Sequence, residues 1–514
     1  MSIPIKSPCE ESERTTAPDS SPAASGSWIL TATILASSMA FIDGTVVNVA
    51  LPALQSTLHA TASGVQWVVE SYSLLLASLL LLGGSLGDLY GRRKIFVLGV
   101  LLFAVASTWC GLAPSITSLI LARGLQGVGA ALLVPGSLAL ISASFAAEQR
   151  GRAIGTWSGF TAITTAIGPV LGGWLIEHLS WRYVFFLNLP LAAAVVLISL
   201  TRVPESRNEC ASRTLDWLGA ILATLGLGAI TYALIEAPAG GAAVWITAVA
   251  GLCALAAFLK VEASSTAPMI SLRLFRSQDF SGANLLTFLL YAALGGIFFF
   301  LPLDLIQVQR YSATKAGAAF LPLILLLFIL SRWSGGLVAR FGARPPLTVG
   351  TLVAALGFAL FLRPGIGGSY WTTFFPPVAV LGIGMSISVA PLTTAVMESL
   401  STSEAGVASG VNNAVSRIAG LLAIAVFGLV LSAGFNRSLN RCLSRIELSP
   451  GARQEVDRQR SRLAGAQTSD PRIRQAIDEA FVSGFRDVIW ISVVLALLST
   501  ASAQMIGTAK PARR

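Results

Sequence analysis

Charged side chains inside apolar stretches are the residues of this sequence that could carry chemistry. Asp43 lies in the middle of the apolar stretch 28–50, Glu70 lies early in the next stretch, and Arg123 is the only basic residue of another. A charge at the centre of a bilayer costs roughly 2.5–3.5 kcal/mol on insertion scales, so such residues are usually functional. Burial disfavours the ionised form of a carboxyl group, which suits Asp43 for loading a proton outside and releasing it inside. The alternative is a neutral acid that only hydrogen-bonds to a neighbouring helix.

Arg123 needs a carboxylate or carbonyl partner inside a membrane. Asp43 and Glu70 are the candidates, and we expect Arg123 to pair with an ionised carboxylate and to be released when the proton binds. A permanent packing bridge is the alternative. Glu70 could be a second proton site, an anionic contact for cationic substrates, or a side chain that reaches the outer interface. For Asp304 the sequence does not decide between a proton-binding and a substrate-binding role.

The composition places these residues in a membrane protein. The chain has 514 residues, of which 54% are hydrophobic and 12% charged, and its mean hydropathy is +0.73. An average soluble domain carries roughly 25% charged residues, so this chain has too few charges to cover a globular surface. Lipid accepts an apolar exterior, which favours an all-α integral membrane protein because helices satisfy their own backbone hydrogen bonds.

Several other classes of protein are disfavoured. The net charge of +10 comes from basic residues dispersed between apolar stretches, which is not the pattern of a nucleic-acid-binding face. The five cysteines have no paired spacing and there are only two histidines, so we expect no disulfide framework and no metal site. The sequence has no glycine-rich phosphate loop ending in Lys-Ser/Thr, and we expect neither ATP nor another cofactor. A membrane enzyme or sensor is a remote alternative, because no catalytic constellation accompanies the histidines.

Apolar stretches of about 20 residues, the length of a membrane-spanning helix, recur about fourteen times. They lie near 28–50, 65–86, 95–112, 117–141, 152–176, 183–201, 215–236, 242–262, 283–305, 316–338, 346–362, 371–395, 405–432 and 485–507. The implied organisation is a disordered cytoplasmic tail (1–26), a six-helix bundle (27–201), a cytoplasmic linker (202–214), two additional helices (215–262), a second linker (263–282), a second six-helix bundle (283–507) and a cytoplasmic tail (508–514).

Basic residues indicate the orientation of these helices. Short loops on the side opposite to the termini contain only Arg182, Arg310, Lys315 and Arg363, whereas most other loop Lys and Arg residues lie on the termini's side. Lys and Arg favour cytoplasmic loops, so both termini are predicted to be cytoplasmic and the chain to cross the cell membrane, which we expect to be a bacterial inner membrane. The segment 433–483 carries nine arginines yet falls outside by this count. Long loops can translocate regardless of charge, so we keep it as an extracytoplasmic loop.

An internal repeat suggests two related halves. The segments Gly83–Arg93 and Ser334–Arg344 align without gaps, so that Gly91 meets Gly342 and Arg93 meets Arg344. Repeated halves around a central pathway are typical of secondary transporters. Chance similarity between two basic turns is the alternative.

Several motifs in order resemble the fourteen-helix drug:proton antiporter branch of the major facilitator superfamily, from Trp28 to the last helix. They are FIDGTVVNVALP (Phe41–Pro52), GGSLGDLYGRRK (Gly83–Lys94), LARGLQGVGAA (Leu121–Ala131), AIGPVLGGW (Ala166–Trp174), SWRYVFFLNLP (Ser180–Pro190) and GVASGVNNAVSRIAG (Gly406–Gly420). The resemblance implies the major facilitator fold, with two pseudo-symmetric six-helix bundles and two extra central helices. The second copy of the loop motif has Ala339 where the first has Asp88, which puts a matching ion pair in doubt.

The resemblance also implies roles for particular residues. Gly84, Gly87, Asp88, Gly91, Arg92 and Arg93 would form a cytoplasmic latch, in which Asp88 is expected to cap the following helix. Gly168, Pro169, Gly172 and Gly173 would form the antiporter motif, with ordinary helix packing as the alternative. Asn48, Gln126, Asn412 and Asn413 are candidates for lining the central cavity or for hydrogen bonds between helices.

The function predicted from the sequence is proton-coupled export of drugs or other small amphipathic compounds by alternating access. A dedicated exporter of one metabolite, peptide or lipid is the main alternative, because it would share every motif above. The expected partners are the small-molecule substrate, protons and membrane lipid, with no nucleic acid. Some relatives in this branch work with a periplasmic adaptor protein, and that partnership is left open.

Overall fold

The computed structural model describes residues 22–207, 215–265, 268–400 and 405–507. Most of the predicted tail 1–26, part of the linker 202–214 and the tail 508–514 lie outside these ranges. Within them every regular element is a helix. Thirteen helices are long and apolar enough to cross a membrane, and Arg344–Leu360 is a shorter apolar helix, in agreement with about fourteen predicted spans. The protein is therefore a multi-pass, all-α membrane protein.

The N-terminal bundle contains the helices that carry the predicted proton site. They are α2 (Pro22–Thr57), α3 (Ala62–Tyr90), α4 (Arg92–Leu112), α5 (Ile116–Ser144), α6 (Ala147–His178), α7 (Arg182–Phe186) and α8 (Asn188–Arg202). Their short connections are closed by side-chain caps, since the Thr61 hydroxyl accepts from Gly64 N and the Ser115 hydroxyl accepts from Ser118 N. These caps fix where α3 and α5 begin.

Two additional helices follow. In α9 (Trp217–Glu236) several residues are buried, and this helix packs against α3 of the first bundle and α17 of the second. In α10 (Ala242–Ser264) the buried residues are Gly251 and Glu262, so nearly the whole of this helix is left for lipid to cover.

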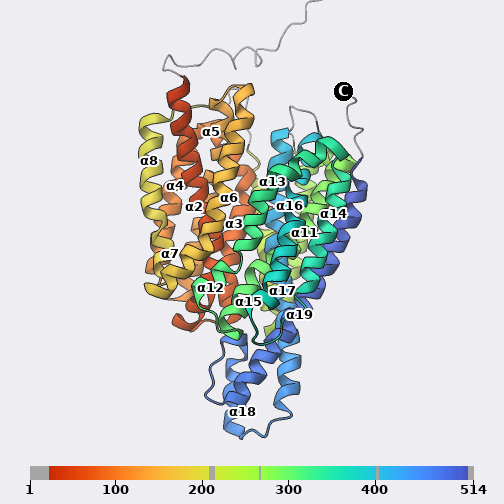
Figure 1. The fold of residues 1–514 in the computed structure, drawn as a ribbon. Helices are drawn as coiled ribbons and strands as arrows, with labels where there is room; N and C mark the ends of the chain where they lie inside the picture. The colour runs from red at the N-terminus through yellow and green to blue at the C-terminus, as the bar shows by residue number, and fades with distance from the viewer. Residues whose placement is uncertain (1–21, 208–214, 266–267, 401–404, 508–514) are drawn as a thin grey trace, which may run out of the picture.

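The C-terminal bundle repeats the plan of the first. It comprises α11 (Gln278–Leu303), which continues into a π-helical turn η3 (Asp304–Val308), then α12 (Ala313–Ala318), α13 (Leu321–Phe341), α14 (Arg344–Leu360), α15 (Tyr370–Thr373), α16 (Phe375–Glu398), α17 (Ala405–Leu443) and α19 (Pro471–Ser502). Short 3₁₀ turns lie at η1 (Ala237–Ala239), η2 (Leu272–Arg276) and η5 (Ala503–Met505). Figure 1 shows the two bundles side by side.

The segment 433–483 is largely helical. α17 continues to Leu443, α18 (Pro450–Gln459) and the 3₁₀ turn η4 (Arg460–Gly465) follow, and α19 begins at Pro471. Figure 1 shows α18 projecting beyond the bundles at the bottom, past the ends where α12 and α15 lie. We call residues 444–470 the cap.

Candidate functional site

Asp43 and Arg123 form an ion pair that is sealed from solvent. Arg123 Nη1 contacts Asp43 Oδ2, and the two side chains are 1% and 0% exposed. Arg123 also donates from Nε to the Val68 carbonyl at 3.0 Å, and its guanidinium lies 4.3 Å from the centre of the Tyr72 ring. Of the two predicted candidate partners, the structure therefore places Asp43 against Arg123.

A shell of amides surrounds the Asp43 carboxylate. Gln126 Nε2 and Asn188 Nδ2 donate to Asp43 Oδ1 at 2.8 and 3.1 Å. Both amides also donate to the Ser107 hydroxyl, at 2.7 and 3.1 Å. Because every one of these groups donates toward the carboxylate, the arrangement stabilises its ionised form.

Four helices hold the pair together. Asp43 comes from α2, Arg123 and Gln126 from α5, Ser107 from α4, and Asn188 from the first residue of α8. Sequence reasoning proposed Gln126 as a cavity residue and missed Asn188, Ser107 and Tyr72. Asn188 could have been found, since it lies inside the Ser180–Pro190 motif, but Ser107 and Tyr72 carry no signal of their own.

Glu70 is buried separately. Its side chain is 0% exposed, and neither carboxylate oxygen has a hydrogen-bond partner among the described residues. The alternative in which Glu70 reaches the outer interface is therefore wrong. One helical turn away, Gln66 donates to the Ile424 carbonyl of α17 at 2.9 Å, so this face of α3 meets the opposite bundle.

Asp304 begins the π-helical turn and is 2% exposed. Gln309 Nε2 donates to its Oδ2 at 3.2 Å, while Oδ1 has no partner in the described chain. Burial, and then the nearby Asp304, raise the pKa of Tyr311, which lies between the spanning segments. Asp304 thus lies at the C-terminal end of α11, on a different bundle from the Asp43 pair.

The predicted latch is assembled around Glu205, which sequence reasoning did not single out. Its carboxylate accepts from the backbone N–H groups of Arg93 and Lys94 at 2.9 and 3.2 Å and so caps α4. The expectation that Asp88 caps this helix is wrong, because Asp88 instead binds Arg92 Nε at 2.8 Å. Arg93 Nη1 donates to the Val203 carbonyl at 3.0 Å.

Glycine is required at the turn of this latch. Gly91 has φ +116°, and a Cβ there would lie 2.9 Å from the Glu205 carboxyl group. Its predicted counterpart Gly342 has φ +77°. Gly91 N and Gly342 N donate back to Gly87 O at 3.0 Å and to Val338 O at 2.8 Å, so the two turns share one geometry. The other two latch glycines lie in α3, where a Cβ at Gly84 would meet Pro135 Cβ at 3.6 Å and one at Gly87 would meet Arg92 Cα at 3.9 Å.

The predicted antiporter motif packs in two directions. A Cβ at Gly168 would lie 3.5 Å from Ile42 Cα, and one at Gly172 would lie 3.2 Å from Val46 Cβ, so this face of α6 touches the helix of Asp43. A Cβ at Gly173 would lie 2.7 Å from Thr314 Cα, and one at Gly317 would overlap the Pro169 backbone. The motif therefore connects the Asp43 helix with α12 of the opposite bundle.

The other cavity candidates lie elsewhere. Asn48 Oδ1 is buried without a described partner, Asn412 Nδ2 donates to Thr287 Oγ1 at 2.7 Å, and Asn413 is exposed. Asn412 thus makes a contact between α17 and α11. Arg417, which sequence reasoning passed over within its motif, lies in α17 with its Nε buried and without a described hydrogen-bond partner.

Known proteins resemble the chain in sequence. The profile of the Major Facilitator Superfamily matches residues 33–424. The multidrug resistance protein Stp of Mycobacterium tuberculosis is 38% identical, over 82% of this chain and 79% of its own length. The tetracenomycin C resistance and export protein of Streptomyces glaucescens is 33% identical over 77% and 74%. The methylenomycin A resistance protein of Bacillus subtilis is 33% identical over 76% and 85%.

Solved structures share the fold at low sequence identity. A bacterial homologue of the human lysosomal transporter Spinster, in an inward-facing and occupied conformation, has a TM-score of 0.66 at 18% identity and covers 95% of this chain and 97% of its own. A D-xylose–proton symporter has a TM-score of 0.60 at 13% identity, covering 96% and 100%. These similarities support the predicted two-bundle fold.

Proposed function

The chain belongs to the major facilitator superfamily, and we propose on that basis that it exports drugs or other small amphipathic compounds in exchange for protons. It is a transporter of small molecules and not an enzyme. The observation that carries the proposal is the sealed Asp43–Arg123 pair inside an apolar bundle. The names of the relatives, which include a multidrug resistance protein and a resistance and export protein, support export as the direction of transport.

Proton binding at Asp43 would switch this pair. With Asp43 ionised, the Arg123 guanidinium and the two amides hold α2, α5 and α8 together. A proton entering from outside removes the carboxylate charge and with it the attraction for Arg123, so the helices are freed to move. Return of the proton to the cytoplasm restores the pair. The electrical part of the gradient supplies about 2.3 kcal/mol per charge per 100 mV.

The motif on α6 would carry this change to the other half. Gly168 and Gly172 of this motif lie against the α2 residues on either side of Asp43, Ile42 and Val46. Gly173 lies against Thr314 of α12. A shift of α2 therefore changes the surface on which the C-terminal bundle rests. Since packed interfaces of this kind have discrete arrangements, the shift favours alternation between two states.

Export of one dedicated compound is the second candidate function. Two of the relatives are named for resistance to a single compound, tetracenomycin C or methylenomycin A. Deletion of the gene separates the candidates: hypersensitivity to many unrelated compounds supports the first, and accumulation of one metabolite, peptide or lipid supports the second.

The proton mechanism is tested by substrate-driven proton release from vesicles, with ethidium as the probe. The wild type should release protons when ethidium is added, and Asp43→Asn should lose this release about 100-fold or more while still binding ethidium, because an amide carries no titratable proton. The control Glu262→Gln changes another buried acid, in α10, and should exchange normally. Normal exchange by Asp43→Asn would refute the assignment, and full coupled export by Arg123→Gln would refute the switching role.

The location is part of the same proposal. Crossing the bacterial inner membrane with both termini in the cytoplasm would place the latch at Gly91 inside the cell and α18 outside it. A partnership with a periplasmic adaptor stays a prediction of the family resemblance.

A further inference from the structure

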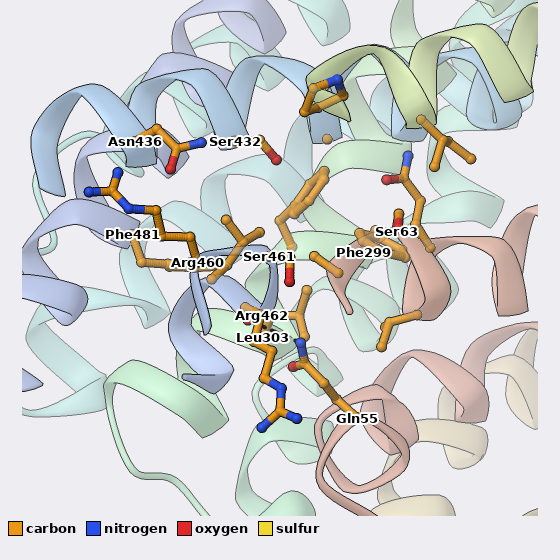
Figure 2. Close-up of a pocket in the computed structure, with 18 of the residues that line it drawn as sticks. Gln55, Ser63, Phe299, Leu303, Ser432, Asn436, Arg460, Ser461, Arg462 and Phe481 are labelled. Carbon is orange, nitrogen blue, oxygen red and sulfur yellow. Dashed lines mark hydrogen bonds between the residues drawn. The ribbon is translucent and has the colours of Figure 1, made fainter. Parts of the chain in front are cut away.

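A cavity of about 330 Å³ lies between the two bundles at the end from which α18 projects. Its wall combines Gln55 of α2, Gln66 of α3, Glu236 of α9, Phe299 of α11, Asn436 of α17 and Leu463 of the cap. Figure 2 shows these elements converging on one space, with Gln55 and Arg462 on one side and Ser432 and Asn436 on the other. The volume is within the usual range for small-molecule sites, about 300–1,000 Å³.

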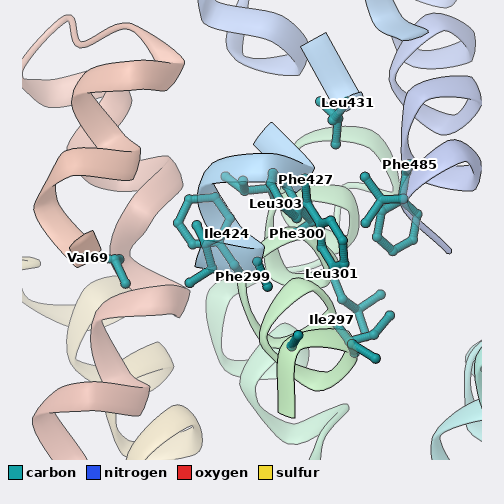
Figure 3. Close-up of a cluster of buried hydrophobic side chains, with 14 of the residues drawn as sticks. Val69, Ile297, Phe299, Phe300, Leu301, Leu303, Ile424, Phe427, Leu431 and Phe485 are labelled. Atoms are coloured by element: carbon teal, nitrogen blue, oxygen red, sulfur yellow. The ribbon is translucent and has the colours of Figure 1, made fainter. Parts of the chain in front are cut away.

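The inner wall of this cavity is an apolar seal. The Phe299 and Phe300 rings meet edge to face with centres 4.7 Å apart, and both are 3% exposed. Figure 3 shows Val69 of α3 facing Phe299 and Ile424 across the boundary between the bundles. Val69 directly precedes Glu70 in α3. An apolar wall at this position suits the apolar part of a ligand.

The outer wall is a turn of the cap. Gln55 Nε2 donates to the Arg462 carbonyl at 3.0 Å, and Gln307 Nε2 donates to Gln55 Oε1 at 2.7 Å. One chain of amides therefore joins both bundles to the cap. Leu463 is 8% exposed, which places its side chain among the buried residues of the core.

Backbone strain marks this turn. Leu463 has φ +53°, a backbone conformation that is unfavourable for a leucine. Within the described chain the other non-glycine residues with positive φ are His59 and Arg310, which lie in the loops after α2 and η3 at the same end of the bundles. Strain held against a wall by hydrogen bonds is released when that wall moves, so the turn is suited to opening.

The polar groups of the wall indicate the kind of ligand. Glu236, Asn436 and Ser432 face the cavity, and no described side-chain hydrogen bond engages them. Arg460 is already bound, to Asp457 Oδ1 and to Asn440 Oδ1, at 2.6 Å each. The cavity thus has an apolar wall on one side and unengaged hydrogen-bonding groups on the other, which fits an amphipathic molecule.

We propose that this cavity is an exit-side binding site for amphipathic compounds with an apolar body and a hydrogen-bonding group, closed to the outside by the η4 turn of the cap. The proposal rests on the proposed export function. Compounds that have passed the Phe299 seal bind here and leave when the turn around Leu463 moves away from Gln55.

The test fills the cavity from one wall. Ser432→Trp places an indole in the space from α17, and the matched control Ser438→Trp adds the same side chain six positions along the same helix, outside the lining. Photolabelling with ethidium azide is the first readout. The wild type and Ser438→Trp should be labelled in the peptides containing Phe299 and Leu463, and excess ethidium should protect both peptides. In Ser432→Trp the labelling of these peptides should be at least tenfold weaker.

Transport is the second readout. Ser432→Trp should lower the kcat of ethidium export at least tenfold while the number of protons released per ethidium stays at the wild-type value, because the proton site at Asp43 is untouched. Unchanged labelling or an unchanged kcat in Ser432→Trp would overturn the exit site. Absence of proton release in the wild type would instead overturn the proposed function, and the labelling would still decide whether the cavity binds the probe. Thermal stability of both Trp variants shows whether either has failed to fold.

Discussion

At the scale of single residues, the Asp43–Arg123 pair is better explained by switching than by stability. Removing one partner of a buried ion pair costs about 3–5 kcal/mol, whereas replacing both by apolar residues is often neutral or stabilising. Stability alone therefore does not explain why an ion pair occupies these positions, because an apolar pair would serve equally well. The amides of Gln126 and Asn188 bind the same carboxyl group as Arg123, so the proposed switch would rearrange several contacts at once.

Glu70 gives a prediction at the same scale. If Glu70 binds and releases a proton during each cycle, Glu70→Gln should lower ethidium export at least tenfold and reduce the number of protons released per ethidium, since glutamine resembles the neutral acid but cannot ionise. Because the side chain is sealed and unpaired, the substitution should change thermal stability little. Proton release and export from vesicles measure the two effects.

Glu262→Gln is the matched control for that experiment. Glu262 is also buried, at 3% exposed, but it lies in α10 and accepts a hydrogen bond from Ile270 N at 3.1 Å. Its replacement should leave export at the wild-type rate. A Glu70→Gln protein with wild-type rate and proton count would show that Glu70 is a permanently neutral packing residue.

Sequence reasoning could single out residues whose type alone is costly in a membrane, although it passed over Arg417. Asp43, Glu70 and Arg123 stand out because apolar neighbours surround each of them. The choice of Asp43 over Glu70 as the partner of Arg123 could not be made, because it depends on which faces of α2, α3 and α5 meet. Glu205 was missed for a similar reason, since its partners Arg93 and Lys94 lie more than 100 positions away.

At the scale of elements, the close approach of α6 and α12 depends on missing side chains. Gly173→Val should keep α6 from resting on Thr314, so the bundles cannot close at this end and export should fall at least tenfold. Gly159→Val is the control, because no atom lies within 4 Å of a Cβ at that position of the same helix. Export of ethidium and the melting temperature of each purified variant provide the measurement.

The outcome can contradict the role of the motif in two ways. Equal export by Gly173→Val and Gly159→Val would show that contact with α12 is dispensable. Equal loss in both variants would show that valine is harmful anywhere in α6, so that the glycines serve ordinary helix packing.

The membrane-spanning helices were predictable because each one is an apolar stretch of sufficient length. The cap was not. Residues 433–483 are polar and rich in arginine, a composition that indicates a loop, yet α17 continues to Leu443 and α18 forms at Pro450. Local pairing helps to stabilise this helical structure: Arg460 binds Asp457 at 2.6 Å, and Arg474 binds Asp478. Such i,i+3 and i,i+4 contacts favour helices but leave no apolar pattern to detect.

At the scale of the whole molecule, the two halves are related but not equivalent. Gly91 and Gly342 close matching turns, while Asp88 has Ala339 as its counterpart in the sequence alignment. The buried ion pair between Asp43 and Arg123 belongs to the N-terminal bundle alone. We therefore infer a division of labour in which that bundle handles the proton and the C-terminal bundle supplies much of the surface against which the cavity opens and closes.

The orientation of the whole chain is the remaining prediction, and the arginine-rich segment is its critical test. Ion pairs such as Arg460–Asp457 and Arg474–Asp478 offset part of the positive charge of this segment, which eases its placement outside the cell despite the preference of arginine for the cytoplasm. In a variant without native cysteines, Arg453→Cys should react with a membrane-impermeant maleimide in intact cells. Arg150→Cys, exposed at the opposite end of the bundles, should react only after the cells are opened. Labelling of Arg150→Cys in intact cells, with Arg453→Cys protected, would show that the proposed orientation is reversed. The direction in which Asp43 is proposed to load its proton would then be reversed as well.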